Sequence, residues 1–516
     1  MKKLIPLILI ISLLFTSCQL RSDEIIPLET ETVTEAQTEY YSYTFSQTES
    51  ETATQEELTV MNIITGVAST VVSTLASTKP AKTTVKSTRI NRTTVKQTEK
   101  TTVKATLKPT EVSITKTVKP ATSSPVTTSK IAATNATTKA QTTTASAVSN
   151  ELRGIWISCY DHISAAGKTK DEYKSATDKM FRNIKDLGLN TAFVHLRAFS
   201  DAFYQSDIYP YSSYIAGKEG ANLPFDPFAV MLESAKAYGI SVHGWINPFR
   251  VSTKKDPSIL SEKNPAKAIL NSGNADGEIC ILSNGIYYNP SCPSNHERII
   301  DGVREIISKY NIDGIHIDDY FYPSTDSSID KKQYSLYKSE GGTLSLDDWR
   351  RNSVNAFVSA LYSAVKSADS SLIFSISPAA QLDKNYDEYY ADCELWLSRT
   401  GYADLIIPQI YFGFEHDTQD FATLLKKWSS LSRVSGVKLA CGLAAYKCAT
   451  KDSYAGSGSA EWQNKTDILA RQLRAVRNNK NYGGFVVFSY QDLTRTACKT
   501  EIQNLKKAIG ETQGNS

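Results

Sequence analysis

Short apolar runs recur along the second part of the chain, and stretches with helical spacing separate them. A buried strand of a parallel sheet is a nearly continuous apolar run, whereas an amphipathic helix repeats its apolar residues every three or four positions. The pattern therefore predicts eight strands. They are Arg153–Ser158, Thr191–Leu196, Ser241–Ile246, Gly314–Ile317, Leu372–Ile376, Leu405–Ile410, Lys438–Leu443 and Phe485–Ser489.

A helical pattern follows each predicted strand. Tyr173–Leu187 places apolar residues at helical spacing, and Asp226 with Pro227 is a typical helix start. Gly188 and Gly239 mark helix exits. The first two helices are Tyr173–Leu187 and Asp226–Tyr238; the others are Asn295–Tyr310, Asp347–Ala368, Asp387–Arg399, Asp417–Ser432, Glu461–Asn479 and Cys498–Ile509.

Eight strands that alternate with eight helices predict an α/β fold, a parallel (β/α)8 barrel of the TIM type, over residues 150–510. An open doubly wound sheet is the alternative, but it would need a glycine-rich phosphate turn after an early strand. Two connections are long, 248–292 and 320–346. Both leave the carboxyl ends of strands, where barrel enzymes build their active sites.

The first residues predict export. Lys2 and Lys3 precede an apolar run, Leu4–Phe15, and small residues then lead to Cys18. This arrangement predicts a lipoprotein-type signal peptide over 1–17, with Cys18 as the lipidated new terminus and a membrane contact through that lipid. Plain secretion with a cut nearby is the alternative. We expect the mature chain at the extracellular face of the membrane, lipid-anchored or secreted.

Residues 18–149 are dominated by Thr, Ser and Lys and contain a loose Thr-Thr-Val-Lys repeat. Such a segment cannot bury enough apolar surface to offset its ordering entropy, so we predict a disordered tether. The formal net charge of the chain is only +3, which gives no support for nucleic-acid binding. We expect a monomer without a cofactor.

In the segment from Asn311 to Pro323, NIDGIHIDDYFYP, a predicted strand is followed directly by two acidic residues. Side chains alternate along a strand, so Ile315 and Ile317 point one way while His316 and Asp318 point into the barrel. Asp318 is our first candidate for a catalytic carboxyl group, and we expect Arg197 to keep it ionised. A structural role in capping the following turn is the alternative.

Glycosidic cleavage uses two carboxyl groups, one as acid and one as nucleophile or base. Asp319 is a candidate partner, although alternation predicts that it points away, to hold the loop or orient Arg250. Asp201 and Glu415 are the other candidates. A separation of about 5 Å would predict retention of anomeric configuration, and roughly 6.5–9.5 Å inversion.

Rings, amides and charged groups gather at the other predicted strand ends. Rings stack on the apolar faces of sugars, and amides or charged groups bind hydroxyl groups in pairs. The candidate substrate-binding residues are His195, Arg197, Tyr204, Trp245, Asn247, Arg250, His316, Tyr320, Gln409 and Tyr411.

Segments in a fixed order resemble the bacterial glycosyl-hydrolase-like family ten. They are RGIWIS, LRAFSDAFYQS, FDPFAVMLESAKAYGISVHGWINPFR, YNPSCP, YNIDGIHIDDYFYP, WRRNSVNAFV, SISP and IIPQIYF, between Glu151 and Asp492. The resemblance implies a parallel barrel, an exported or lipoprotein location, and cleavage of cell-wall glycan such as peptidoglycan without stem peptides. Motif residues carried over by position are Arg197, Asp201, Asn247, Arg250, Asp318, Asp319, Tyr320, Gln409 and Tyr411.

This sequence departs from the family pattern at two places. The family usually has Pro and Gly near Ala198–Ser200, and an Ala where Gly244 stands. These departures affect the rim of the site and therefore the substrate.

Two other functions are open. His195, His243 and His316 with Asp318 could hold zinc in a metal-dependent barrel hydrolase, but no strand carries a paired His-x-His, and we predict no metal site. The chain could also be a wall-polysaccharide-binding protein without activity. Among the cysteines, Cys280–Cys292 and Cys441–Cys448 are close enough in sequence to be bridges, with free thiols as the alternative.

Overall fold

The computed structural model describes residues 151–273, 275 and 277–511. The predicted signal peptide 1–17, the lipidation site Cys18 and the tether 18–149 lie outside the described residues.

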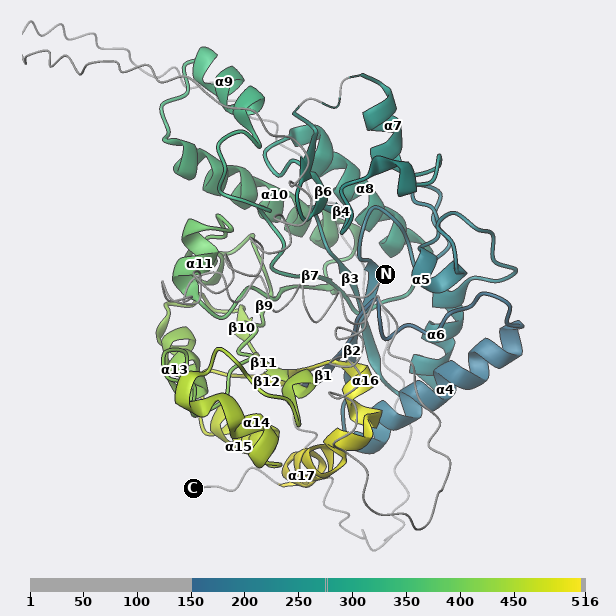
Figure 1. The fold of residues 1–516 in the computed structure, drawn as a ribbon, viewed down its shortest axis with the longest axis vertical. Coiled ribbons are helices and arrows are strands. Elements are labelled where there is room, and N and C mark those ends of the chain that lie inside the picture. Colours follow the sequence, from purple (N-terminus) through teal and green to yellow (C-terminus); the bar gives the residue numbers. More distant parts are fainter. Residues whose placement is uncertain (1–150, 274, 276, 512–516) are drawn as a thin grey trace, which may run out of the picture. The chain divides into compact units, whose positions relative to one another are not determined.

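The described residues form a parallel β-barrel surrounded by helices (Figure 1). The sheet order is β10-β9-β8-β7-β3-β2-β1-β12-β11, and every pairing in it is parallel. The predicted fold class is therefore confirmed. Its strands are β1 (Leu152–Ile157), β2 (Thr191–Arg197), β3 (Ser241–Ile246), β7 (Gly314–Ile317), β8 (Ile373–Ile376), β9 (Leu405–Ile406), β10 (Lys438–Leu439), β11 (Cys441–Ala444) and β12 (Gly484–Phe488).

The two ends of this sheet are one interrupted strand. β10 and β11 are separated only by Ala440, and β10 pairs with β9 whereas β11 pairs with β12. The same stretch of chain thus contacts both edges and closes the barrel. Counted in this way, the described residues contain the eight barrel strands that the apolar runs predict.

Each barrel strand is followed by an outer helix, as predicted. The capping predicted for the second helix is present, because the Asp226 carboxylate accepts hydrogen bonds from the backbone N–H groups of Phe228 and Ala229. Gly188 ends the first helix in the left-handed conformation, with φ 93°. The outer helices are α4 (Lys170–Leu187), α6 (Pro227–Ala237), α8 (Pro293–Lys309), α10 (Leu346–Ala368), α12 (Cys393–Ser398), α13 (Phe421–Ser430), α15 (Ile468–Arg477) and α17 (Lys499–Gly510).

The connections add shorter elements. An antiparallel sheet of order β4-β6-β5 lies between β3 and α8, in one of the two long connections. The short elements are α5 (Ser213–Ala216), β4 (Arg250–Ser252), η1 (Pro257–Ile259), α7 (Pro265–Asn271), β5 (Ile279–Leu282), β6 (Gly285–Tyr288), α9 (Lys331–Ser339), α11 (Leu382–Asp387), η2 (Ala445–Lys447), η3 (Gly456–Ala460), α14 (Glu461–Asn464), α16 (Tyr490–Thr494) and η4 (Thr496–Cys498).

Alternation along the strands separates two hydrophobic cores. Trp156, Phe193 and Trp245 belong to the core inside the barrel. Their strand neighbours, such as Ile155 and Ile317, belong to the larger core between the strands and the outer helices. The outward direction predicted for Ile315 and Ile317 of β7 therefore holds.

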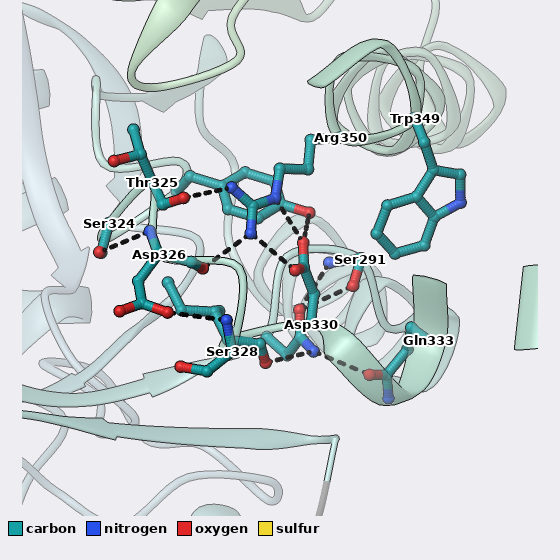
Figure 2. A network of polar contacts seen from close by, with 12 residues as sticks. Ser291, Ser324, Thr325, Asp326, Ser328, Asp330, Gln333, Trp349 and Arg350 are labelled. Carbon is teal, nitrogen blue, oxygen red and sulfur yellow. Dashed lines mark hydrogen bonds and ion pairs between the residues drawn. The ribbon is translucent and has the colours of Figure 1, made fainter. Parts of the chain in front are cut away.

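A buried ion pair fixes the connection between β7 and α10 (Figure 2). Arg350 on α10 donates to both carboxylate oxygens of Asp330, at 2.7 Å each, and neither side chain is exposed. The same guanidinium donates to the carbonyl oxygens of Thr325 and Asp326, at 2.9 and 2.8 Å. One side chain thus satisfies several groups of the 320–346 connection, which begins at the carboxyl end of β7.

Two glycines of neighbouring strands make a matched test of the barrel packing. A Cβ on Gly314 would collide with the backbone carbonyl of Ile373 and lie 2.6 Å from His243 Nδ1. The one close contact of a Cβ on Gly244 would be with the flexible end of Leu196, at 2.9 Å. We expect Gly314→Ala to lower the free energy of unfolding by about 3 kcal/mol, and Gly244→Ala by about 1 kcal/mol or less. Urea unfolding measures both, and equal losses would contradict this packing.

The seven cysteines among the described residues are buried and unpaired. The bridges Cys280–Cys292 and Cys441–Cys448 that the spacing allowed do not form. In the part of the chain that the structure describes, no helix has the length and apolar character needed to cross a membrane.

Candidate active site

A pocket opens at the carboxyl ends of the barrel strands. Predicted residues that line it come from β2 and β3, from the start of β4 and from the segments that follow β7 and β9. The structure therefore brings together residues that lie more than two hundred positions apart. These are His195, Trp245, Arg250, Asp318, Asp319, Tyr320, Gln409 and Tyr411.

Asp318 lies in the wall of this pocket, directly after β7, and is 2% exposed. Its Oδ2 accepts hydrogen bonds from Trp245 Nε1 at 3.0 Å and Asn247 Nδ2 at 3.5 Å. Its Oδ1 has no hydrogen-bond partner among the described residues. A buried polar atom without a partner is rare and costly, so Oδ1 is the atom from which a bound substrate would accept a proton or a hydrogen bond.

Burial and, to a smaller extent, the neighbouring carboxylate of Asp319 together raise the pKa of Asp318 to about 8. The hydrogen bond from Trp245 and the charge of Arg250 oppose this rise only in part. Asp318 is therefore largely protonated at neutral pH. The sequence analysis expected an ionised carboxylate, whereas burial of Asp318 favours the neutral form and outweighs the nearby cation.

Asp319 also lines the pocket, which corrects the expectation that it points away. β7 ends at Ile317, so strict alternation no longer holds for the residues that follow. Gln409 Nε2 donates a hydrogen bond to Asp319 Oδ1 at 3.1 Å, and burial raises the pKa of this carboxyl as well. Two carboxyl groups of adjacent residues thus share one pocket.

The cation beside Asp318 is Arg250, not Arg197. Arg250 lines the pocket, with its guanidinium 4.6 Å from the ring centre of Tyr320. Arg197 instead donates to the carbonyl oxygens of Phe199 and Pro248 and is 1% exposed. The register between β2 and β3 shifts between His195 and Arg197, and this bulge turns Arg197 out of the alternation that the prediction assumed.

Three other candidates lie outside the pocket wall. Tyr204 is buried and donates to Glu305 Oε2 at 2.9 Å. Glu415 is exposed and forms an ion pair with Lys465. His316 lies deeper in the barrel, where Trp156 Nε1 donates to its Nε2 at 3.0 Å. These positions indicate structural contacts, and the structure does not bring Glu415 to Asp318 as a second carboxyl.

Asp201 lies beside the pocket, in the wall of an adjoining groove. It is 6% exposed, and its Oδ1 has no hydrogen-bond partner among the described residues. Burial raises the pKa of Asp201 to about 7, against the opposing effect of a hydrogen bond with Ser212. Asp201 is thus a candidate for contact with a bound molecule at the groove.

The inward histidines are not arranged as a metal site. His195 stacks on Trp245, with ring centres 3.7 Å apart and planes at 7°. Nε2 of His316 is already occupied by the hydrogen bond from Trp156. Within the described ranges, no group of three or more His, Cys, Asp or Glu side chains could hold a metal ion. The described residues therefore provide no ligand set for the zinc alternative.

Several pocket residues were not singled out from the sequence. Trp156, Tyr160, Phe199 and Phe488 contribute rings to the wall. Trp156 could have been found by extending the alternation argument to β1, where Ile155 and Ile157 point outward. Tyr160 and Phe199 follow their strands in loops, where alternation gives no direction.

Comparison with known proteins shows the family of this chain. The model of the family glycosyl hydrolase-like 10 matches residues 151–456. The chain belongs to this family. The glycosyl hydrolase-like 10 match includes the pocket residues from Trp156 to Tyr411 and ends before β12.

Curated relatives of this glycosyl hydrolase-like 10 chain are named as glycosyl hydrolases. It is 31% identical over 367 residues to glycosyl hydrolase YngK of Bacillus subtilis (strain 168), covering 67% of this chain and 69% of that protein. It is 28% identical over 333 residues to glycosyl hydrolase DigH of Escherichia coli (strain K12), covering 58% of this chain and 74% of that protein.

Among solved structures, the glycoside hydrolase domain of PgaB (BpsB) from Bordetella bronchiseptica matches with a TM-score of 0.47 and 12% identity. The match covers 69% of this chain and 98% of that chain.

Proposed function

We propose that this chain is a glycoside hydrolase that cleaves glycosidic bonds in bacterial cell-wall glycan, such as peptidoglycan without stem peptides. The observation that carries the proposal is Asp318, a buried carboxyl group with one unpartnered oxygen in a pocket lined by rings. The family and the names of its curated relatives support hydrolysis of a glycan. The cell-wall substrate and a location outside the membrane rest on the family resemblance and on the predicted export signal.

In the proposed mechanism Asp318 is the general acid. Because Oδ2 accepts the hydrogen bond from Trp245, the proton of the neutral carboxyl group is placed on Oδ1, from which it passes to the leaving glycosidic oxygen. Asp319 is the second carboxyl group, which attacks the sugar or takes a proton from water, and Gln409 holds it in place. Trp245 is fixed by its stacking on His195 and provides a flat ring for the sugar.

This assignment predicts that activity falls at high pH. Because the pKa of Asp318 is raised to about 8, the acid loses its proton as the pH rises through that value, and kcat should fall about tenfold for each further pH unit. Initial rates of glycan cleavage, measured at a series of pH values, test this fall in kcat. A rate that stays constant well above this pH would assign the acid role to another group.

The direct test is digestion of purified, peptide-free peptidoglycan by the full-length protein, followed by mass spectrometry of the products. Soluble sugar fragments would establish the activity and identify the bond that is cleaved. Binding of the glycan without any fragment, also with intact wall as substrate, would instead favour a wall-binding protein without activity.

A further inference from the structure

A wide groove continues from the pocket of Asp318. The pocket itself is narrow, about 40 Å³, whereas the groove has a volume of about 960 Å³, within the range of ligand sites of about 300–1,000 Å³. Phe199 lines both, so the two spaces adjoin. The groove lies between the connection that follows β2, which includes α5, and the connection that follows β3, which includes β4 and η1.

Polar atoms without partners lie in the wall of this groove. Asp201 is more than nine-tenths buried, and its Oδ1 accepts no hydrogen bond from the described residues. The hydroxyl of Ser261 is also buried without a hydrogen-bond partner. Beside them, the rings of Phe199 and Tyr214 stack with centres 6.1 Å apart and planes at 19°. Rings next to unsatisfied hydrogen-bonding atoms are suited to a sugar, which has apolar faces and a rim of hydroxyl groups.

The charged residues of the groove differ in whether they have hydrogen bonds or ion pairs within the protein. Glu219 accepts hydrogen bonds from Asn264 Nδ2 at 2.8 Å and from the backbone of Ser261 at 3.3 Å. Glu262 forms an ion pair with Lys267. Lys218 and Lys254 are exposed, and the described residues provide no ion pair for either. Lys218 and Lys254 are therefore cations of the groove that can reach the carboxylate of a ligand.

We propose that this groove is a second sugar subsite, which binds a further residue of the same glycan, and that Lys218 and Lys254 bind a carboxylate group on that residue. The inference rests on the proposed function, whose glycan carries lactyl carboxylates, and adds the groove and the two side chains that recognise them. Its position beside the pocket places the acidic sugar next to the bond that Asp318 cleaves. Asp201 is then a substrate-binding group of the subsite and not the second catalytic carboxyl group.

The test compares two glycans that differ only in charge. The acidic substrate is a set of peptide-free peptidoglycan oligosaccharides, whose lactyl groups carry carboxylates, and the neutral substrate is the same set after chemical reduction of these carboxylates to alcohols. Full-length protein is compared with the variant Lys218→Ala/Lys254→Ala. The control is Lys179→Ala/Lys506→Ala, which removes two exposed lysines of α4 and α17 outside the groove.

We expect the groove variant to raise KM for the acidic glycan about tenfold, the combined effect of two exposed ion pairs, with kcat unchanged. KM for the neutral glycan should not change, and the control should behave as the parent. The preference of the parent for the acidic glycan should shrink as salt is added, because exposed pairs are screened.

Equal KM values of the parent for both glycans would overturn the carboxylate subsite while leaving the proposed hydrolase intact. The same conclusion follows if the groove variant keeps the preference. If the parent cleaves neither glycan, the proposed function fails, and the subsite fails with it.

Discussion

Replacing Asp318 by asparagine should abolish glycan cleavage without destabilising the protein. The variant keeps the size of the side chain and an oxygen for the hydrogen bond from Trp245 Nε1. It removes the proton that the leaving oxygen needs, so we expect kcat to fall by at least about a thousandfold, within the usual effect of a general acid.

Stability should change in the opposite direction to activity. The pKa of Asp318 is raised to about 8 in the folded protein, whereas in the unfolded chain it is about 3.9. The folded state therefore loses stability as the pH rises from about 4 to about 8, because only the unfolded chain ionises freely. Asparagine does not ionise, so the variant does not lose stability in this way. Its Tm should exceed that of the parent at pH 8 by about 2 °C or more, and by less at lower pH.

Activity assays and thermal unfolding at several pH values check both expectations. Asp186→Asn, an exposed carboxylate on α4, is the matched control and should change neither property. A variant of Asp318 that unfolds at a much lower temperature would mean that this residue holds the structure together. In that case its effect on cleavage would no longer identify a catalytic group.

Arg350→Ala should be among the most destabilising single changes in the barrel. It would leave the Asp330 carboxylate, which is 0% exposed, buried without its cation, and would remove the hydrogen bonds to the carbonyl oxygens of Thr325 and Asp326 (Figure 2). Breaking a buried ion pair from one side costs about 3–5 kcal/mol. We therefore expect a loss of this size in the free energy of unfolding, measured by urea titration of the full-length protein.

The neighbouring Arg351 provides the control. It pairs with Asp348 at 2.7 Å, but Asp348 is 53% exposed, so Arg351→Ala should cost about 1 kcal/mol or less. The double change Arg350→Met with Asp330→Leu should recover part of the loss, because no charge then remains buried. Equal costs for Arg350→Ala and Arg351→Ala would show that burial of the pair is not the reason.

The barrel could be predicted from the sequence because its strands are buried on both faces and its helices are not. Each strand is a short apolar run, and Gly188, Gly239 and Asp226 mark where helices end or begin. Alternation also gave the inward direction of His316, because β7 is regular up to its last residue. The outer helices were less exact, since α14 and α15 divide the stretch Glu461–Asn479 that the pattern placed in one helix.

The candidate site was predicted less completely, because it begins where regular structure ends. A bulge turned Arg197 away from the pocket, and the end of β7 at Ile317 brought Asp319 into it. Sequence spacing contains no signal for either event. Tyr204 and Glu415 follow strands in loops, and their directions depend on contacts with Glu305 and Lys465 that are distant in sequence.

The way in which the barrel closes also bears on how the chain folds. β1 pairs with β12, so the first strand of the domain finds one of its neighbours only when residues near Gly484 have been synthesised. Until then both β1 and β11 present unpaired edges, and such edges invite association with other chains. A chain that stops short of β12 should therefore aggregate instead of forming a smaller barrel, and the sheet's longest-range pairing should form among the last steps of folding.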